Sequence, residues 1–324
     1  MPHKQSRCTP AKFFTGPRAK QRILTMKIAV TGANSSVGQN LLAQIVAQDE
    51  ISVVAGVRSE PAKASLPSSP RIEPRIISYE DSEGLADLFT AVDCVVHLAG
   101  ILMENRQTSY ASANVATTAA VVQAAKRSAI KHLVFISVIG ADTNAANAYF
   151  RSKGCAEKLV AESGISASII RTPILLGPDT AGAKALLGAA SQTRIRVLGG
   201  GHYLMRPLDV DDLGAAILRC CESLSAGTTS HELAGPETIS YRELIARTAK
   251  LLGREIQVGY MPIWLAKLGA AIGSTLRGGG ITATVIDVIT KDEVIQTNAD
   301  SALGISLTAL QSTLEKITHK KRSS

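Results

Sequence analysis

The sequence predicts an α/β fold, a doubly wound parallel sheet with a smaller C-terminal part. Short apolar runs rich in valine and isoleucine alternate with helical patterns from residue 26 onward, as in repeated β-α-β units. Of the 324 residues 45% are hydrophobic but only 4% are aromatic, so alanine, valine, isoleucine and leucine must form the core. A glycine-rich turn, TGANSSVG, directly follows the first apolar run.

Residues 26–176 are expected to form the sheet-containing domain. Apolar runs predict strands at Lys27–Thr31, Ile51–Val57, Arg75–Ser78, Val92–Leu98, Leu133–Ser137 and Ala167–Ile174. Apolar residues at helical spacing predict helices at Val37–Gln48, Ser82–Thr90, Ser112–Ser128 and Tyr149–Ser163. The serine- and proline-rich stretch Ser59–Pro74 is expected to be a loop.

Residues 177–317 are expected to form the substrate-binding part, folded over the strand ends. The pattern predicts helices at Ala183–Ser191, Val210–Ser223, Tyr241–Leu252 (with Ser240 as its cap) and Thr308–Ile317, and a strand at Ile195–Leu198. The most apolar late stretch, Pro262–Leu276, is interrupted by Lys267. A packed amphipathic helix and a peripheral membrane contact both stay open for this stretch.

The net charge of +8 does not predict nucleic-acid binding, because the excess positive charge lies at the ends of the chain. Residues 1–25 contain six lysines and arginines and no acid, and the basic tail 318–324 adds three more. The rest of the chain is nearly neutral. Two interpretations of residues 1–25 stay open: an upstream start, with the working chain beginning at Met26, or a disordered or cleaved leader.

The five cysteines favour a cytoplasmic protein without a metal site. Cys8, Cys94, Cys155, Cys220 and Cys221 show no metal-ligand spacing, and small thiols are typical of a reducing compartment. No apolar run reaches the ~18 residues that a transmembrane helix needs. The three aspartates of RPLDVDDL are expected to act at a helix start, with a metal site as the weaker alternative.

The turn TGANSSVG has the order of elements that a dinucleotide pyrophosphate requires: strand, glycine-rich turn, helix. Gly32 permits the tight turn, and Gly38 lets the helix pack close to the sheet. The free amides at the helix start and the helix dipole favour bound phosphate. Ser35 replaces the middle glycine of the usual pattern, and its hydroxyl can donate to phosphate.

The end of the second predicted strand favours NADP(H) over NAD(H). An NAD enzyme usually carries an acid there, which accepts from the ribose 2′-hydroxyl. Here Arg58 and Ser59 follow the strand, and a guanidinium pairs well with a 2′-phosphate. The alternative is a solvated Arg58, with Glu60 taking the part of the acid.

Tyr149 and Lys153 are the candidate catalytic pair. They are four residues apart at the start of a predicted helix and therefore share one face. An ammonium beside a phenol lowers its pKa, so that the tyrosine can exchange a proton while hydride passes to or from a nicotinamide. His97 lies within the apolar strand of VVHLAG and is expected to be a buried packing residue.

The motifs and their order resemble the extended and atypical short-chain dehydrogenases/reductases. The resemblance is carried by TGANSSVG, VVHLAG, Asn114, HLVFIS, Tyr149-x-x-x-Lys153, IIRTPILLGP, RPLDVDDLGAAI and HELAGPETISYRELI, and it spans about residues 26–317. The pattern is most similar to the NAD(P)-binding proteins related to the nucleotide-binding accessory subunit of respiratory complex I. More broadly, it is similar to NmrA-like proteins and to NAD-dependent epimerases and dehydratases.

This resemblance implies a Rossmann fold and a set of cofactor-binding residues. Gly32, Asn34, Ser35, Ser36, Val37 and Gly38 would surround the pyrophosphate, and Leu98, Ala99, Gly100 and Lys153 would line the ribose and nicotinamide end. Asn114 matches the helix asparagine of the family, which often has a structural role.

The third catalytic residue leaves two function classes open. Ser137 is the candidate hydroxyl, whereas Ile139 stands two positions further on, where extended-type epimerases usually carry it. One class is an NADP(H)-dependent oxidoreductase acting on a carbonyl, alcohol or sugar-nucleotide-like substrate, with epimerases and dehydratases as a variant. The other is a nucleotide-binding structural or regulatory subunit. A homodimer and a peripheral place in a larger complex are the expected alternatives for protein partners.

Overall fold

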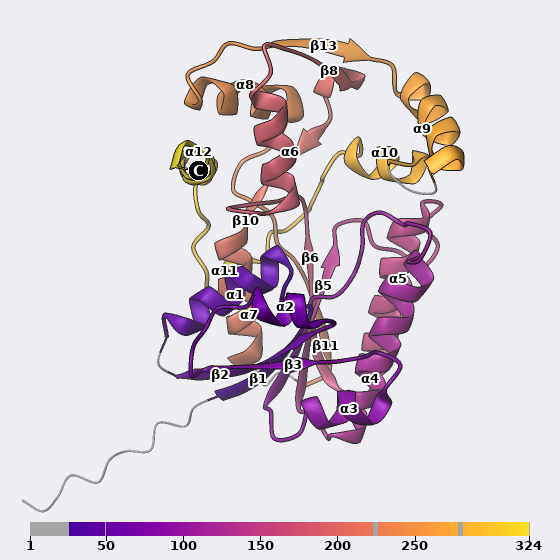
Figure 1. The fold of residues 1–324 in the computed structure, drawn as a ribbon, viewed down its shortest axis with the longest axis vertical. Helices are drawn as coiled ribbons and strands as arrows, with labels where there is room; N and C mark the ends of the chain where they lie inside the picture. The colour runs from indigo at the N-terminus through magenta and orange to yellow at the C-terminus, as the bar shows by residue number, and fades with distance from the viewer. Residues whose placement is uncertain (1–25, 49, 223–225, 278–280, 324) are drawn as a thin grey trace, which may run out of the picture.

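The computed structural model describes residues 26–48, 50–222, 226–277 and 281–323. The expectations for residues 1–25 lie outside these ranges. At the centre is a seven-stranded sheet, all of whose strand pairs are parallel (Figure 1), in the order β11-β6-β5-β4-β1-β2-β3. The strands are β1 (Met26–Thr31), β2 (Ile51–Val57), β3 (Ile72–Ile76), β4 (Cys94–His97), β5 (His132–Val138), β6 (Ser166–Thr172) and β11 (Thr228–Glu232). The predicted α/β class is confirmed.

Helices cover both faces of this sheet. Helices α1 (Ser36–Val46) and α7 (Val210–Glu222) pack on one face, and α3 (Ser82–Leu88), α4 (Thr117–Arg127) and α5 (Ala148–Ala161) pack on the other. A π-helical turn, η1 (Ala111–Ala116), precedes α4. Alternate strand residues face opposite layers, since Ile28 and Val30 belong to the first core and Ala29 to the second. Both layers are needed because a parallel sheet buries both of its faces.

Strand β1 lies where the direction of winding reverses. Its neighbours are β2 on one side and β4 on the other, and Thr31 pairs with both Gly56 and His97. The chain runs outward from β1 through β2 to β3 and then crosses back to β4. Ligands of open α/β sheets bind outside the carboxyl ends of the strands at such a switch point.

The C-terminal part has its own apolar core and lies above the strand ends in Figure 1. Its helices are α6 (Ala181–Ala190), α8 (Tyr241–Leu251), α9 (Ile263–Arg277), α10 (Ala283–Ile289) and α12 (Leu310–Ser323). Helix α11 (Asp300–Leu303) instead packs beside α7 on the seven-stranded sheet. Three short strand pairs accompany them: β7 (Leu175–Leu176) with β10 (Leu208–Asp209), β9 (Leu204–Met205) with β12 (Ile239–Ser240), and β8 (Arg194–Leu198) with β13 (Gln257–Met261). The Ser240 hydroxyl caps α8 by accepting from the Glu243 amide, as predicted.

Three expectations about local structure were wrong. The strand expected at Arg75–Ser78 instead forms as β3 (Ile72–Ile76). Ser59–Pro74 is no continuous loop, because it contains helix α2 (Glu60–Ala64) and the start of β3. Pro61 fits the first turn of a helix, where no amide partner is needed, and Pro74 is tolerated because β3 is an edge strand. Helix α12 also continues through Ser323, beyond the expected end at Ile317.

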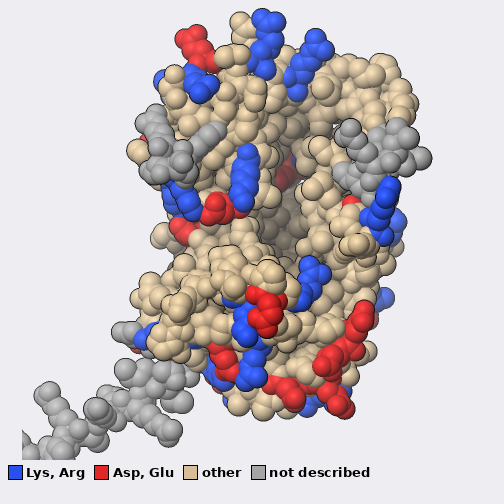
Figure 2. Space-filling view, in the orientation of Figure 1, with Lys and Arg blue, Asp and Glu red and all other residues tan. Residues whose placement is uncertain are grey.

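Figure 2 shows that the face in view is hollowed between the sheet-containing part and the C-terminal part, with lysine and arginine side chains at the rim. Among the described residues, no helix is both long and apolar enough to cross a bilayer.

Candidate functional site

The glycine-rich turn packs directly against the end of β4. Gly32 has a φ of +76°, and a Cβ at this position would lie 3.0 Å from the backbone nitrogen of Ala99. A Cβ on Gly38 would lie 2.4 Å from the carbonyl oxygen of Ala33. Both glycines are therefore required by close backbone approach, and Gly32 also by its left-handed conformation. The turn therefore presents bare backbone, without side chains, beside the end of β4.

The start of α1 provides donors for an anion. Ser35 is its N-cap, and the Ser35 Oγ accepts from the Gly38 amide at 3.0 Å. This bond uses an oxygen lone pair, so the hydroxyl proton of Ser35 stays available for a phosphate. The first-turn amides of Ser36 and Val37 have no intrahelical acceptor, and no acidic residue lies in the first turn. Asn34 is exposed beside them. These residues fit a pyrophosphate group.

Beyond β4, the predicted ribose-binding segment lies at the switch point. The Leu98 amide donates to the Thr31 carbonyl at 3.1 Å, which joins this segment to the end of β1. A Cβ on Gly100 would lie 3.1 Å from the Asn114 Oδ1 and 4.0 Å from the Lys153 Nζ. The segment therefore lies between the glycine-rich turn and the side chain of Lys153.

Asn114 has a structural role at this point. It is 1% exposed; its Oδ1 accepts from the Ile101 amide, and its Nδ2 donates to the Ile101 carbonyl and to the Ser152 hydroxyl. Both amide protons are thus used within the protein. Its side chain fixes the path of the chain after Gly100, and it would act on a cofactor through that segment rather than by contact.

His97 is a buried packing residue, as predicted. Its Nδ1 lies 2.7 Å from the Thr31 hydroxyl and its Nε2 lies 3.2 Å from the Thr118 hydroxyl. Burial, with a smaller effect of the Lys153 charge, lowers the pKa of His97 to about 3. It is therefore neutral at physiological pH and cannot act as a general acid.

Lys153 is held among the strand ends. It is 6% exposed, its Nζ donates to the Ile136 carbonyl at 2.7 Å, and the Nζ lies 4.3 Å from the centroid of the Phe135 ring. Burial lowers the pKa of Lys153 to about 8, whereas the charge of Glu157 opposes this shift. The amine is thus the titrating group of the site closest to neutral pH.

Tyr149 does not have the lowered pKa that its spacing from Lys153 suggested. Its ring packs against Tyr110 and Phe150, with centroids 5.7 Å apart in each case. Burial, together with Tyr110, raises the pKa of Tyr149 well above its usual value. Desolvation by burial is the larger cause of this shift. Tyr149 is a neutral phenol that can donate a hydrogen bond or a proton.

Ser137 is the last fully buried residue of β5. It is 1% exposed, and its Oγ is the one buried side-chain oxygen or nitrogen of the described chain that has no hydrogen-bond partner. An unsatisfied buried hydroxyl costs about 1–3 kcal/mol. Ile139, at the position of the usual hydroxyl, donates its amide to the Thr172 carbonyl and offers no polar side chain.

Arg58 lies directly after β2, at the carboxyl end of that strand. It is exposed directly after β2, and its charge acts on the pKa of Tyr79, which follows β3. Glu60 instead forms an ion pair with Lys63 of α2 at 3.9 Å. The guanidinium of Arg58 is exposed to solvent at the carboxyl edge of the sheet.

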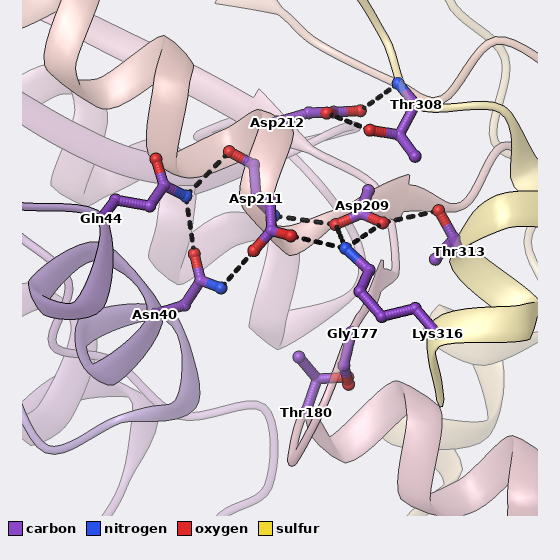
Figure 3. A network of polar contacts seen from close by, with 10 residues as sticks. All are labelled: Asn40, Gln44, Gly177, Thr180, Asp209, Asp211, Asp212, Thr308, Thr313 and Lys316. Atoms are coloured by element: carbon purple, nitrogen blue, oxygen red, sulfur yellow. Dashed lines mark hydrogen bonds and ion pairs between the residues drawn. The ribbon is translucent and has the colours of Figure 1, made fainter. Parts of the chain in front are cut away.

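A network of ion pairs and hydrogen bonds joins α1 to α12 through α7 (Figure 3). The Lys316 Nζ of α12 lies 2.7 Å from the carboxylate of Asp209 and 2.5 Å from that of Asp211. The Asp211 carboxylate accepts in turn from Asn40 of α1. The Asp209 side chain is fully buried and also accepts from the Thr313 hydroxyl.

The acidic cluster of RPLDVDDL therefore has a second role besides its position at a helix start. Asp211 and Asp212 lie in the first turn of α7, as expected, but Asp212 also accepts from the amide and hydroxyl of Thr308. No local signal in the sequence points to Asn40 or Lys316, because each lies more than a hundred residues away from the acidic cluster in the sequence. Within the described part of the chain, no group of three or more His, Cys, Asp or Glu side chains could hold a metal ion.

The guanidinium of Arg171 at the end of β6 is held by two carboxylates. It forms a bidentate pair with the largely buried carboxylate of Glu157, at 3.0 and 2.6 Å, and it lies 3.7 Å from Glu232. These two carboxylates hold the guanidinium within the protein.

Comparison with known proteins agrees with this geometry. A family model described as NAD(P)H-binding matches residues 32–197, about half of the chain. Quinone oxidoreductase 2 of Escherichia coli is 23% identical over 263 residues, which is 80% of this chain and 86% of that protein. The mitochondrial NADH dehydrogenase [ubiquinone] 1 alpha subcomplex subunit 9 of Arabidopsis thaliana is 24% identical over 273 residues, 81% of this chain and 66% of that protein.

Solved structures share the fold. MoeE5 in complex with UDP-glucose and NAD has a TM-score of 0.71 at 19% identity, covering 92% of this chain and 99% of the other. The UDP-glucose 4-epimerase of Thermotoga maritima has a TM-score of 0.70 at 17% identity, with the same coverage. At these identities the likeness concerns the fold alone.

Proposed function

The chain belongs to the NAD(P)H-binding family, and from this premise we propose that it is an NADP(H)-dependent oxidoreductase acting on a carbonyl or alcohol substrate. Three groups support the proposal: the phosphate turn at Gly32–Gly38, the amine of Lys153 at the strand ends, and the hydroxyl of Ser137. All three belong to segments that meet at the carboxyl edge of the sheet.

The single observation that carries the proposal is the unpartnered Ser137 hydroxyl. A fold that satisfies every other buried polar side-chain atom in its described part leaves this one unsatisfied, at the end of the strand whose Ile136 carbonyl holds Lys153. Unsatisfied buried groups are often functional. We assign Ser137 the role of holding the substrate oxygen or the nicotinamide ribose.

The roles of Tyr149 and Lys153 follow from their protonation. Bound NADPH would supply the hydride. Tyr149, kept neutral by burial, would donate its proton to the oxygen of the reduced carbonyl. Lys153, with a pKa near 8, is mostly protonated at neutral pH and would stabilise the resulting phenolate and bind the ribose hydroxyls.

We assign NADP(H) as the preferred cofactor because of Arg58. A charge-assisted bond to a 2′-phosphate contributes about 1.5–3 kcal/mol, so Arg58→Ala is expected to weaken NADPH binding roughly tenfold or more and to leave NADH binding unchanged. Arg75→Ala is the matched control, since Arg75 is an exposed arginine of β3 that pairs with Glu73. Equal effects of Arg58→Ala on both cofactors would contradict the assignment.

The activity test uses protein purified without added cofactor. Any released nucleotide is identified after denaturation, and NADPH absorbance is then followed with a panel of carbonyl compounds. Quinones belong in this panel because a relative is a quinone oxidoreductase, and sugar nucleotides belong in it because fold neighbours are described with them. Turnover that is lost in Tyr149→Phe supports the proposal, and turnover that persists removes Tyr149 from the mechanism.

A nucleotide-binding subunit without catalysis is the second candidate. It is favoured by Ile139 at the usual hydroxyl position and by relatives named as subunits of NADH dehydrogenase. Tightly held nucleotide with no turnover on any substrate would favour this candidate. An epimerase or dehydratase, which recycles its cofactor, would interconvert sugar nucleotides without net NADPH consumption.

For location and partners we propose a cytoplasmic protein that binds a small-molecule substrate, either as a homodimer or at the periphery of a larger complex. The cysteines of the described chain are all free, and Cys94, Cys220 and Cys221 are buried, as suits a reducing compartment. Size-exclusion chromatography with light scattering distinguishes a monomer from a dimer.

A further inference from the structure

Lys291, just after α10, carries a positive charge that no acid in the described part of the chain pairs with. It is exposed, and it takes part in none of the ion pairs formed there. Its Nζ lies instead 4.5 Å from the centroid of the Phe150 ring. A Cβ added to Gly140 would lie 2.9 Å from the same Nζ. The ammonium is therefore held over bare backbone and the face of one aromatic ring.

The two acids that follow Lys291 in the chain are used elsewhere. The Asp292 carboxylate accepts from a backbone amide of β9 at 2.8 Å. The two carboxylate oxygens of Glu293 accept from the amides of Ile174 and Arg206, each at 2.9 Å. These bonds attach the segment to the C-terminal part on both sides of its backbone. They therefore fix the position of Lys291 and leave its charge without a counterion.

The segment that carries Lys291 packs on the candidate catalytic helix. Asn147, the N-cap of α5, donates its Nδ2 to a carbonyl of α10 at 3.0 Å. Val288 of α10 packs against the aromatic cluster that contains Tyr149 and Phe150. In Figure 1, α10 accordingly lies at the upper end of α5. The rings of Tyr149 and Phe150 are 5.7 Å apart, so a single ring separates the Lys291 ammonium from the proposed proton donor.

The loop beneath the ammonium also begins at an unsatisfied polar group. Gly140 is three residues after Ser137, whose buried hydroxyl has no hydrogen-bond partner. The segment from β5 to α5 thus has an unpartnered hydroxyl at its start and an unpaired ammonium over its glycine. A lysine ammonium has three donors, and a carboxylate or phosphate accepts charge-assisted hydrogen bonds from it.

We propose that Lys291 recognises an anionic group, a carboxylate or a phosphate, on the carbonyl substrate. This inference rests on the proposed function, because it takes Tyr149 and Ser137 as the residues that contact the carbonyl oxygen. The ammonium then selects anionic carbonyl compounds over neutral ones of the same shape.

The test compares pairs of aldehydes that differ in charge, with NADPH and the full-length protein. One pair is para-carboxybenzaldehyde and its methyl ester, and the other is glyceraldehyde phosphate and glyceraldehyde. The kcat/KM of the anionic member should exceed that of the neutral member in at least one pair, and the pair that responds identifies the group. Lys291→Met should lower this preference roughly tenfold or more, because a charge-assisted bond is lost. Lys291→Arg, which keeps the charge, should retain most of it.

The matched control is Lys131→Met. Lys131 is an exposed lysine directly before β5, at the end of that strand opposite to Gly140, and its replacement should leave the preference unchanged. Equal kcat/KM values within both pairs would overturn the inference, as would a preference that persists in Lys291→Met.

A binding measurement separates this inference from the proposed catalysis. Benzoate and benzamide are each titrated by calorimetry into the protein saturated with NADPH. Tighter binding of benzoate that is lost in Lys291→Met supports the anion site, and it does so even where no aldehyde is turned over, a result that would contradict the oxidoreductase alone. Turnover of aldehydes without any preference for the anions would overturn the role of Lys291 and leave the oxidoreductase in place.

Discussion

The phosphate turn predicts opposite outcomes for one substitution at two helical glycines. In Gly38→Ala the new Cβ would lie 2.4, 2.7 and 2.8 Å from the carbonyl oxygen, carbonyl carbon and Cα of Ala33. These are backbone atoms, so the turn itself must move by about 1 Å to reach an ordinary contact. Overpacking of this kind costs about 1–3 kcal/mol, whereas the higher helix propensity of alanine returns about 1 kcal/mol.

We therefore expect Gly38→Ala to lower the free energy of unfolding by up to about 2 kcal/mol in urea denaturation. Its NADPH affinity should fall roughly tenfold or more in isothermal titration calorimetry, because Ala33 carries the turn that receives the phosphates.

Gly188→Ala in α6 is the matched control. Gly188 is exposed, and a Cβ added there would have no atom within 4 Å. This variant should gain about 0.5–1 kcal/mol of stability and bind NADPH like the wild type. Equal stability and normal NADPH binding in both variants would refute the packing role assigned to Gly38.

Three further predictions concern single side chains. Ser137→Ala should keep or slightly raise the free energy of unfolding, because it removes an unsatisfied hydroxyl. The same variant should have lower turnover or lower cofactor affinity. A clear loss of stability would show that the hydroxyl has a structural partner. Lys316→Met should lower the free energy of unfolding by up to about 3–5 kcal/mol, because it leaves the buried Asp209 charge unpaired. The control Lys320→Met breaks an exposed pair with Asp179 and should lower it by at most about 1 kcal/mol. Similar urea midpoints for the two variants would contradict this prediction. Since burial lowers the pKa of Lys153 from 10.5 to about 8, the folded state disfavours its charge fully below pH 8, and this penalty disappears as the pH rises toward 10.5. The stability of Lys153→Met relative to the wild type should thus decline over that window by up to about 3 kcal/mol, and a pH-independent difference would argue against the shift.

Most of the sheet could be predicted from the sequence because its central strands are buried on both faces. Strands β1, β2, β4, β5 and β6 are continuous apolar runs, which periodicity detects. The edge strand β11 was missed since its sequence, TTSHE, is polar and largely exposed. The edge strand β3 was misplaced because Glu73, Pro74 and Arg75 hide the pattern.

Some features of the candidate site could likewise be predicted from the sequence, and others could not. Glycine positions and the spacing of Tyr149 and Lys153 are local features of the sequence, and the structure brings their segments to one edge of the sheet. The protonation of Tyr149 was not predictable, because its pKa depends on burial against Tyr110 and Phe150. The link from Asn40 through Asp211 to Lys316 joins distant segments and has no local signature.

The most direct test of the central claim is calorimetric titration of NADPH into the full-length protein after removal of bound nucleotide. The account predicts saturable binding at one site per chain, with NADPH binding more tightly than NADH. Absence of binding by either cofactor would contradict the assignment of the Gly32–Gly38 turn as a dinucleotide site.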